Sequence, residues 1–205
     1  CSQCHDIGAY LCQTCLDKCE HAKELSVEGE KWITSLYSYH DKTIKNAIWE
    51  IKFHGHFAVA EAFGKPLANT IGTLLEQCGV QNALLVPIPP SQSGGKKRGY
   101  NQTFMIARAL IRNLKSKEYK GVLLLPNVLE KIKTTQRQAM IHNKELRLQN
   151  MNGAFAVSKQ QQQLIQGKTV VIVDDVTTTG ATLKDAKRAL LASGAKEVFA
   201  ITIAH

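Results

Sequence analysis

Two adjacent carboxylates, Asp174 and Asp175, are followed at once by a run of small and hydroxyl-bearing residues. Where such a run opens a helix, its N–H groups and hydroxyls bind phosphate, because the helix dipole favours negative charge at that end. Carboxylates beside the phosphate would accept hydrogen bonds from the vicinal hydroxyls of a ribose. The pattern therefore predicts a sugar phosphate ligand. The residues predicted to bind its phosphate are Thr177, Thr178, Thr179, Gly180, Ala181 and Thr182.

The elements on either side of this run would place it at a ligand-binding edge. Val170 to Val173 are four β-branched apolar residues, which predicts a strand buried on both faces of a parallel sheet. Leu183 to Leu191 predict a helix that ends at Ser193 and Gly194. Ligands of open α/β sheets bind at the carboxyl ends of the strands, where the two acids stand.

Three other classes of protein do not fit this stretch. The run after the strand lacks Gly-Lys-Ser/Thr, which excludes a nucleotide-triphosphate P-loop. The chain contains no G-x-G-x-x-G, the dinucleotide-binding fingerprint. A phospho-acceptor receiver domain would also cluster aspartates at strand ends, but it would not need a hydroxyl-rich loop directly after them.

Four cysteines at the start of the sequence form two C-x-x-C pairs, Cys1 with Cys4 and Cys12 with Cys15. Such pairs are typical of a structural zinc site, in which four thiolates complete a tetrahedron and leave no open position. A segment this short would depend on the metal to fold. Disulfides are the alternative, disfavoured because no secretion signal is recognisable. Less favoured zinc ligands are His5, Cys19 and His21.

Length and charge bound the class of protein. The 205 residues suffice for one α/β domain, placed at residues 31–205, behind a zinc-binding knuckle and linker at residues 1–30. Lys plus Arg exceed Asp plus Glu by 26 − 17 = 9, which favours an anionic partner, although scattered solvated lysines give the same excess. No stretch approaches the ~18 apolar residues of a membrane helix, so we expect no membrane insertion.

Two cationic segments could bind a pyrophosphate. Lys96, Lys97 and Arg98 lie in a loop after the predicted strand 83–89, and the alternative for them is a solvated surface run. Residues 133–152 are polar and cationic with little apolar periodicity, which predicts a mobile lid.

Apolar periodicity predicts further elements: strands at 32–39, 128–132 and 153–157, and helices at 44–52, 59–78 and 103–114. Thr43 is the predicted cap of the first helix. Trp49 and Phe53 lie four residues apart on it, so we expect them in the core, with a surface stacking role as the alternative. Cys78 is also expected in the core. The glutamine-rich run 160–163 predicts a solvated loop tip.

The acid pair with its Thr/Gly run resembles the signature of the type I phosphoribosyltransferases, which bind 5-phosphoribosyl-1-pyrophosphate (PRPP). Further motifs stand in an order similar to that of the ComF family of bacterial competence proteins, which join a zinc finger to a phosphoribosyltransferase fold. Behind the two C-x-x-C pairs these motifs are 86–89, 98–102, 147–150 and 153–155. The resemblance implies a type I phosphoribosyltransferase-like α/β fold, with a mostly parallel sheet flanked by helices.

The resemblance also implies a cytoplasmic protein that serves DNA uptake in natural transformation and handles incoming single strands. One hypothesis is an enzyme that binds PRPP with Mg²⁺ and releases pyrophosphate through an oxocarbenium-like transition state, to an acceptor that the sequence does not identify. Asp174 and Asp175 would hold the ribose. The pyrophosphate and catalytic-loop residues would be Lys96, Lys97, Arg98, Lys131, Lys133 and Arg137.

The other hypothesis is a binding module that keeps the PRPP pocket without catalysis. It would bind single-stranded DNA through cations interleaved with stackable rings. Dimer formation and contacts with other competence proteins stay open. The DNA-binding candidates are Lys45, Lys52, Lys97, Arg98 and Tyr100, with Trp49, Phe53, His54 and His56 as further rings.

Overall fold

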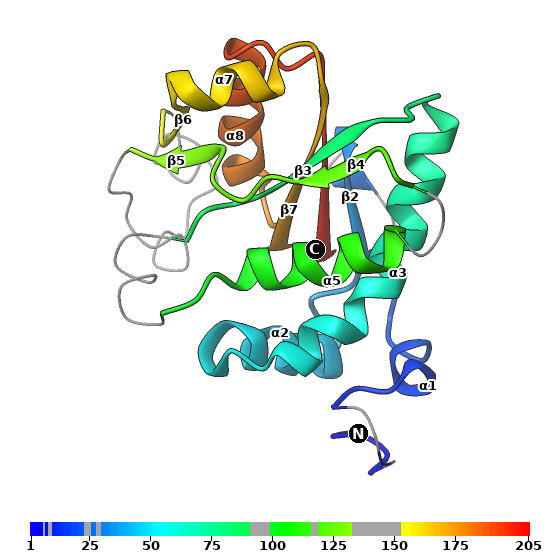
Figure 1. The fold of residues 1–205 in the computed structure, drawn as a ribbon. Coiled ribbons are helices and arrows are strands. Elements are labelled where there is room, and N and C mark those ends of the chain that lie inside the picture. Colours follow the sequence, from blue (N-terminus) through cyan, green and yellow to red (C-terminus); the bar gives the residue numbers. More distant parts are fainter. Residues whose placement is uncertain are drawn as a thin grey trace.

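A computed structural model gives the fold (Figure 1). The residues that it describes are 1–5, 7, 10–22, 26–27, 30–90, 99–115, 119–132 and 153–205.

A six-stranded sheet runs through the centre of the molecule (Figure 1). Its strand order is β1-β2-β8-β7-β3-β4; β1 runs antiparallel to β2, and the other neighbouring pairs are parallel. The mostly parallel sheet predicted from the sequence is confirmed. Its strands are β1 (Ser26–Val27), β2 (Glu30–Tyr37), β3 (Ala83–Pro87), β4 (Val122–Leu124), β7 (Thr169–Val176) and β8 (Glu197–Ala204).

The side chains of β7 alternate between two apolar layers, as strand geometry requires. Val171 and Val173 lie in the layer that holds the buried faces of α2, α3 and α5. Val170 and Ile172 lie in the layer that holds the buried face of α8. Burial on both faces explains why this strand is a continuous apolar run. The helices are α2 (Lys42–His54), α3 (Phe57–Gln77), α5 (Gln102–Lys115), α7 (Lys159–Ile165) and α8 (Ala181–Ala192).

A second, two-stranded antiparallel sheet lies against α8 and consists of β5 (Leu129–Lys131) and β6 (Phe155–Val157) (Figure 1). Asp185 of α8 fastens it: its carboxylate accepts hydrogen bonds from the backbone N–H groups of Gly153 and Phe155, each 2.9 Å long. Arg188 Nε donates to the same carboxylate at 2.7 Å. The sequence predicted both strands but not their separation from the main sheet.

The amino-terminal segment, with the short helix α1 (Gln13–Leu16), is docked on the α/β body. Leu11, Leu16 and Cys19 are buried in the apolar layer that also contains α2 and α3. The backbone N–H of Glu20 donates to Asp41 at 3.0 Å. The metal knuckle predicted here therefore shares a core with the helices beside the sheet.

Three local predictions are wrong, and one strand was missed. Asp41, rather than Thr43, caps α2, since its side chain accepts from the N–H groups of residues 43 and 44. Residues 160–163 belong to α7 and not to a loop tip, and β4 was not foreseen. Cys78 is exposed because it stands at the carboxyl-terminal cap of α3. None of the helices in the described ranges has both the length and the hydropathy needed to cross a bilayer.

Candidate functional site

The acid pair stands at the carboxyl end of β7, at a sheet edge that binds ligands in open α/β folds. Asp174 and Asp175 are only 8% and 7% exposed. The backbone N–H of Asp175 donates to Asp174 Oδ1 at 2.9 Å, and that of Val176 donates to Asp175 Oδ1 at 2.8 Å. Each carboxylate keeps further acceptor capacity beyond these local bonds.

Two buried carboxylates this close cannot both ionise easily. Burial, and after it the charge of Asp175, raise the pKa of Asp174 well above its usual value. The backbone N–H of Asp175 and the charge of Lys52 act in the opposite direction. Asp174 therefore favours its protonated form until a cation or hydroxyl donors arrive.

The loop after β7 leads directly into the amino terminus of α8. Gly180 is the N-cap, with φ 68°, a left-handed conformation that favours glycine. No side chain among the described residues caps the helix in the usual way. Thr179 Oγ1 accepts a long hydrogen bond from Ala181 N at 3.4 Å. A helix start of this kind can bind an anion, and the predicted phosphate site stays a prediction.

A cavity of about 620 Å³ opens beside this loop. One part of its lining, here called the loop wall, is the segment Asp175–Thr182, of which all residues except Thr179 line the cavity; Asp174 does not line it. The other part, here called the helix wall, comes from the segment that follows β2 and from α2. The residues of the helix wall that line the cavity are Tyr39, Lys45, Asn46, Ile48, Trp49, Lys52 and Phe53.

The helix wall exposes aromatic rings to the cavity. Trp49 and Phe53 are each 49% exposed, so their expected place in the core is wrong. Their ring centroids lie 5.4 Å apart, and the Trp49 ring lies 4.6 Å from that of His54. The series continues through His56, 5.7 Å from His54, to Tyr10 of the amino-terminal segment, 5.4 Å from His56. We call these five residues the ring series.

Two of the predicted cations lie near the acid pair. Burial lowers the pKa of Lys131 in β5, and the charge of Asp174 acts in the opposite direction. The Lys131 ammonium is therefore close enough to Asp174 to interact with it by charge. Lys52 also acts on Asp174 by its charge. Both lysines therefore contribute positive potential where a phosphorylated ligand would bind.

The remaining predicted cations, Lys96, Lys97, Arg98, Lys133 and Arg137, lie outside the described residues. Tyr100, a DNA-binding candidate, has a clear structural contact: its hydroxyl donates to the backbone oxygen of Lys52 at 3.1 Å. Its ring also fills the space beside Gly55, where a Cβ would come within 2.9 Å of it. Tyr100 thereby ties the end of α2 to the start of α5.

The sequence missed Gln102, at the start of α5. Its Nε2 donates to Asp175 Oδ2 at 3.4 Å, so it belongs to the acid pair's surroundings. Tyr39 and Asn46 of the helix wall were also missed. Gln102 had a usable signal, because it closes the motif 98–102 that carried part of the family resemblance. The other two had none.

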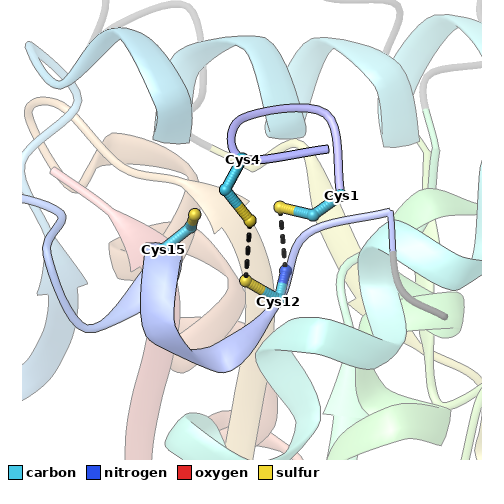
Figure 2. A group of neighbouring side chains, drawn as sticks. All are labelled: Cys1, Cys4, Cys12 and Cys15. Atoms are coloured by element: carbon cyan, nitrogen blue, oxygen red, sulfur yellow. Dashed lines mark hydrogen bonds between the residues drawn. The ribbon is translucent and has the colours of Figure 1, made fainter. Parts of the chain in front are cut away.

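The four predicted zinc ligands converge (Figure 2). The Sγ atoms of Cys1, Cys4, Cys12 and Cys15 all lie within 4.8 Å of one another, and those of Cys4 and Cys12 are 3.6 Å apart. A tetrahedral zinc site with ~2.3 Å bonds places its sulfurs about 3.8 Å apart. The cluster is thus positioned to bind a metal ion, consistent with structural zinc.

The electrostatics of the cluster also suit a cation. A hydrogen bond with Cys4, and after it burial, raise the pKa of Cys15 to about 11. A metal would displace these protons and relieve the crowding of the sulfurs. The less favoured ligands lie elsewhere: Cys19 donates to the Cys15 carbonyl oxygen, and the His21 ring contacts Tyr37.

Comparison with known proteins gives one family and several relatives. Residues 103–205 match the family described as phosphoribosyl transferase domain. The chain is 27% identical to Competence protein ComFC of Bacillus subtilis, over 78% of this chain and 58% of that protein. It is 33% identical to Competence protein F of Haemophilus influenzae, over 56% of this chain and 46% of that protein. It is 29% identical to DNA utilization protein YhgH of Escherichia coli, over 74% of this chain and 62% of that protein.

The alignments therefore span roughly half to three-fifths of these relatives' own length. The family match contains β7, the acid pair, the loop wall and α8, whereas the helix wall and the cysteine cluster lie outside it. The loop wall is thus the part of the cavity that the family match covers.

Proposed function

Because the chain belongs to the phosphoribosyl transferase domain family, we propose that its cavity binds PRPP together with Mg²⁺. The observation that carries this proposal is the direct succession, at one sheet edge, of a buried acid pair and the amino terminus of α8, whose N-cap is the glycine Gly180. The loop wall would bind the 5-phosphate through backbone N–H groups and threonine hydroxyls. Asp174 and Asp175 would accept hydrogen bonds from the ribose hydroxyls.

The acid pair also fits a magnesium-bound ligand. Its oxygens are hard acceptors of the kind that Mg²⁺ prefers, either directly or through water. Because burial and the charge of Asp175 raise the pKa of Asp174, nearby positive charge would stabilise its ionised form, which supports the proposal. Mg²⁺ bound with PRPP would neutralise charge on the pyrophosphate.

If transfer follows binding, the residues of this chain would act mainly by electrostatics. Lys131 and Lys52 would offset the negative charge of the departing pyrophosphate, and the carboxylates would support the positive charge that develops on the ribose. The helix wall would limit access of water to the ribose.

Titration calorimetry with PRPP, in the presence and absence of Mg²⁺, tests the binding proposal. We expect saturable binding that Mg²⁺ strengthens. Pyrophosphate release on addition of candidate nucleobases then separates an enzyme from a binding module. Absence of PRPP binding by the folded protein would overturn the proposal.

We also propose that the four-cysteine cluster holds one structural zinc ion. With four thiolates the tetrahedron is complete, so the metal would stabilise the fold and would have no open position for substrate. The burial of Leu11 and Leu16 in the layer beside α2 supports a structural purpose.

We propose that the protein acts in DNA uptake during natural transformation, because its relatives are named competence protein and DNA utilization protein.

We propose a second activity from one observation, the ring series that leads from the cavity to the amino-terminal segment. Exposed rings beside Lys45 and Lys52 suit single-stranded nucleic acid, since bases stack on rings and phosphates pair with cations. Fluorescence anisotropy of a labelled oligonucleotide at rising salt tests it, with an expected log–log slope near −0.7 per contacted phosphate.

A further inference from the structure

Gln102 begins α5, and its position is fixed by the residue before it. Asn101 Oδ1 accepts hydrogen bonds from the backbone N–H groups of Thr103 and Phe104, at 3.0 and 3.3 Å, and so caps the helix. Thr103 is buried, and its hydroxyl donates to the backbone oxygen of Ile88, at the end of β3. The Gln102 side chain therefore projects from a rigid helix start, beside the acid pair.

The orientation of the Gln102 amide follows from its neighbour. Nε2 donates to Asp175 Oδ2 at 3.4 Å, whereas the flipped amide would set Oε1 against a carboxylate oxygen. Oε1 is left buried, and no described residue donates to it. A buried acceptor without a donor destabilises a protein, so native structures rarely keep one without a reason.

A bound sugar would supply the missing donor. Asp174, Asp175 and Oε1 of Gln102 together form a group of acceptors with few donors of their own, and each sugar hydroxyl brings one donor. A ribose offers vicinal hydroxyls, whereas a 2-deoxyribose lacks one of them.

We propose that Gln102 is a specificity-determining residue, which orients Asp175 through Nε2 and accepts a hydrogen bond from a ribose hydroxyl through Oε1. It would make the site select ribose 5-phosphates over 2-deoxyribose 5-phosphates. This inference rests on the proposed sugar-phosphate function of the cavity. It also separates the two ligands considered above, because the deoxyribose of DNA would not satisfy this acceptor group.

The test compares three ligands by titration calorimetry: ribose 5-phosphate, 2-deoxyribose 5-phosphate and inorganic phosphate. Gln102→Met keeps the side-chain length and removes both polar atoms. We expect its affinity for ribose 5-phosphate to fall about 5- to 10-fold, the effect of one lost hydrogen bond. The ratio of ribose to 2-deoxyribose affinity should fall with it, while inorganic phosphate, which needs only the loop wall, should bind within about twofold of the parent.

Two further variants sharpen the result. Gln102→Glu keeps oxygen acceptors and loses the donor to Asp175, so both sugar phosphates should bind more weakly while their ratio is kept. Gln163→Leu, at an exposed glutamine of α7, is the matched control and should leave all three ligands unchanged.

An unchanged ratio in Gln102→Met, or a collapsed ratio in Gln102→Glu, would overturn the assignment of Gln102. Equal loss of sugar and inorganic phosphate binding in Gln102→Met would also overturn it, since that would mean damage to the loop wall. Failure of the parent protein to bind any of the three ligands would instead reject the proposed function itself.

Discussion

The two walls of the cavity are built in different ways. The loop wall is a single continuous segment, Asp175–Thr182, set by the strand before it and the helix after it. The helix wall is contributed by residues more than a hundred positions earlier and depends on the packing of α2 against α3 and the amino-terminal segment. The composition of the loop wall by itself predicts phosphate binding. The rings of the helix wall were expected in the core, and only the fold shows that they are exposed. We expect the loop wall to bind the phosphate and the helix wall to modify what else can bind.

Loss of zinc should cause the largest loss of stability, and it should disturb the helix wall more than the loop wall. The double variant Cys12→Ser, Cys15→Ser removes two of the four zinc ligands. In zinc-finger peptides, binding of structural zinc stabilises the fold by ~10–16 kcal/mol. We expect elemental analysis to show about one zinc per chain in the parent and none in the variant.

The contrast between the walls predicts that inorganic phosphate still binds to this variant within about threefold, because the loop wall is held by β7 and α8. The matched control is Cys78→Ser, an exposed cysteine outside the cluster, which should keep its zinc. Complete loss of phosphate binding on zinc removal would show that the two walls are not independent.

Asp185→Ala should give the next largest effect, on the side of the loop wall. It leaves the N–H groups of Gly153 and Phe155 and the Nε–H of Arg188 without their acceptor, while Arg188 Nη2 still donates to the Phe155 backbone oxygen. A broken buried pair costs about 3–5 kcal/mol, but Arg188 is half exposed, so we expect about 2–3 kcal/mol from urea denaturation. The exposed Glu197→Ala is the control, with a change below about 0.5 kcal/mol.

The pH dependence of this loss has a definite sign. Burial acts to raise the pKa of Asp185, but hydrogen bonds from Arg188, Gly153 and Phe155 outweigh it and lower the pKa. The stabilisation is therefore present above the carboxyl's pKa in the unfolded chain and is lost as pH falls through the folded value. The stability of the parent should drop more steeply in acid than that of Asp185→Ala; parallel curves would contradict the assignment.

Trp49→Ala, in the helix wall, should weaken oligonucleotide binding without changing phosphate binding. Stacking on one ring contributes about 1–3 kcal/mol per base, so oligonucleotide affinity should fall at least about fivefold in anisotropy measurements. Inorganic phosphate should bind as before. Leu164→Ala on α7 has the same 49% exposure and is the control for general loss of surface area. Equal oligonucleotide binding by parent and Trp49→Ala would remove the helix wall from the DNA proposal.

Asp174→Asn should have the smallest effect on stability, and with the opposite sign to Asp185→Ala. Because burial and the charge of Asp175 raise the pKa of Asp174, the parent loses stability as pH rises through that pKa. The amide cannot ionise, so the variant should unfold about 2–4 °C higher near neutral pH, corresponding to about 1 kcal/mol. Differential scanning calorimetry against pH measures it; a variant less stable than the parent at high pH would contradict the pKa assignment.

The sequence predicted what is encoded locally. Val170 to Val173 became the central strand, the acids came at its end, and the cysteine pairs converged, because spacing along one segment settles each of these. Trp49 and Phe53 were misplaced because apolar periodicity shows which residues share a helix face but not whether another element covers that face. Gln102 was missed because its partner, Asp175, lies seventy-three positions away.

The most direct test of the account is the double variant Asp174→Ala, Asp175→Ala, assayed for PRPP with Mg²⁺ and for inorganic phosphate by calorimetry. Removing about two charge-assisted hydrogen bonds should weaken PRPP binding by roughly 3–6 kcal/mol, or more than about 100-fold. Inorganic phosphate should bind within a few-fold of the parent, since residues 177–182 of the loop wall are unchanged. PRPP affinity equal to that of the parent in the folded double variant would contradict the central claim that this acid pair holds the ribose.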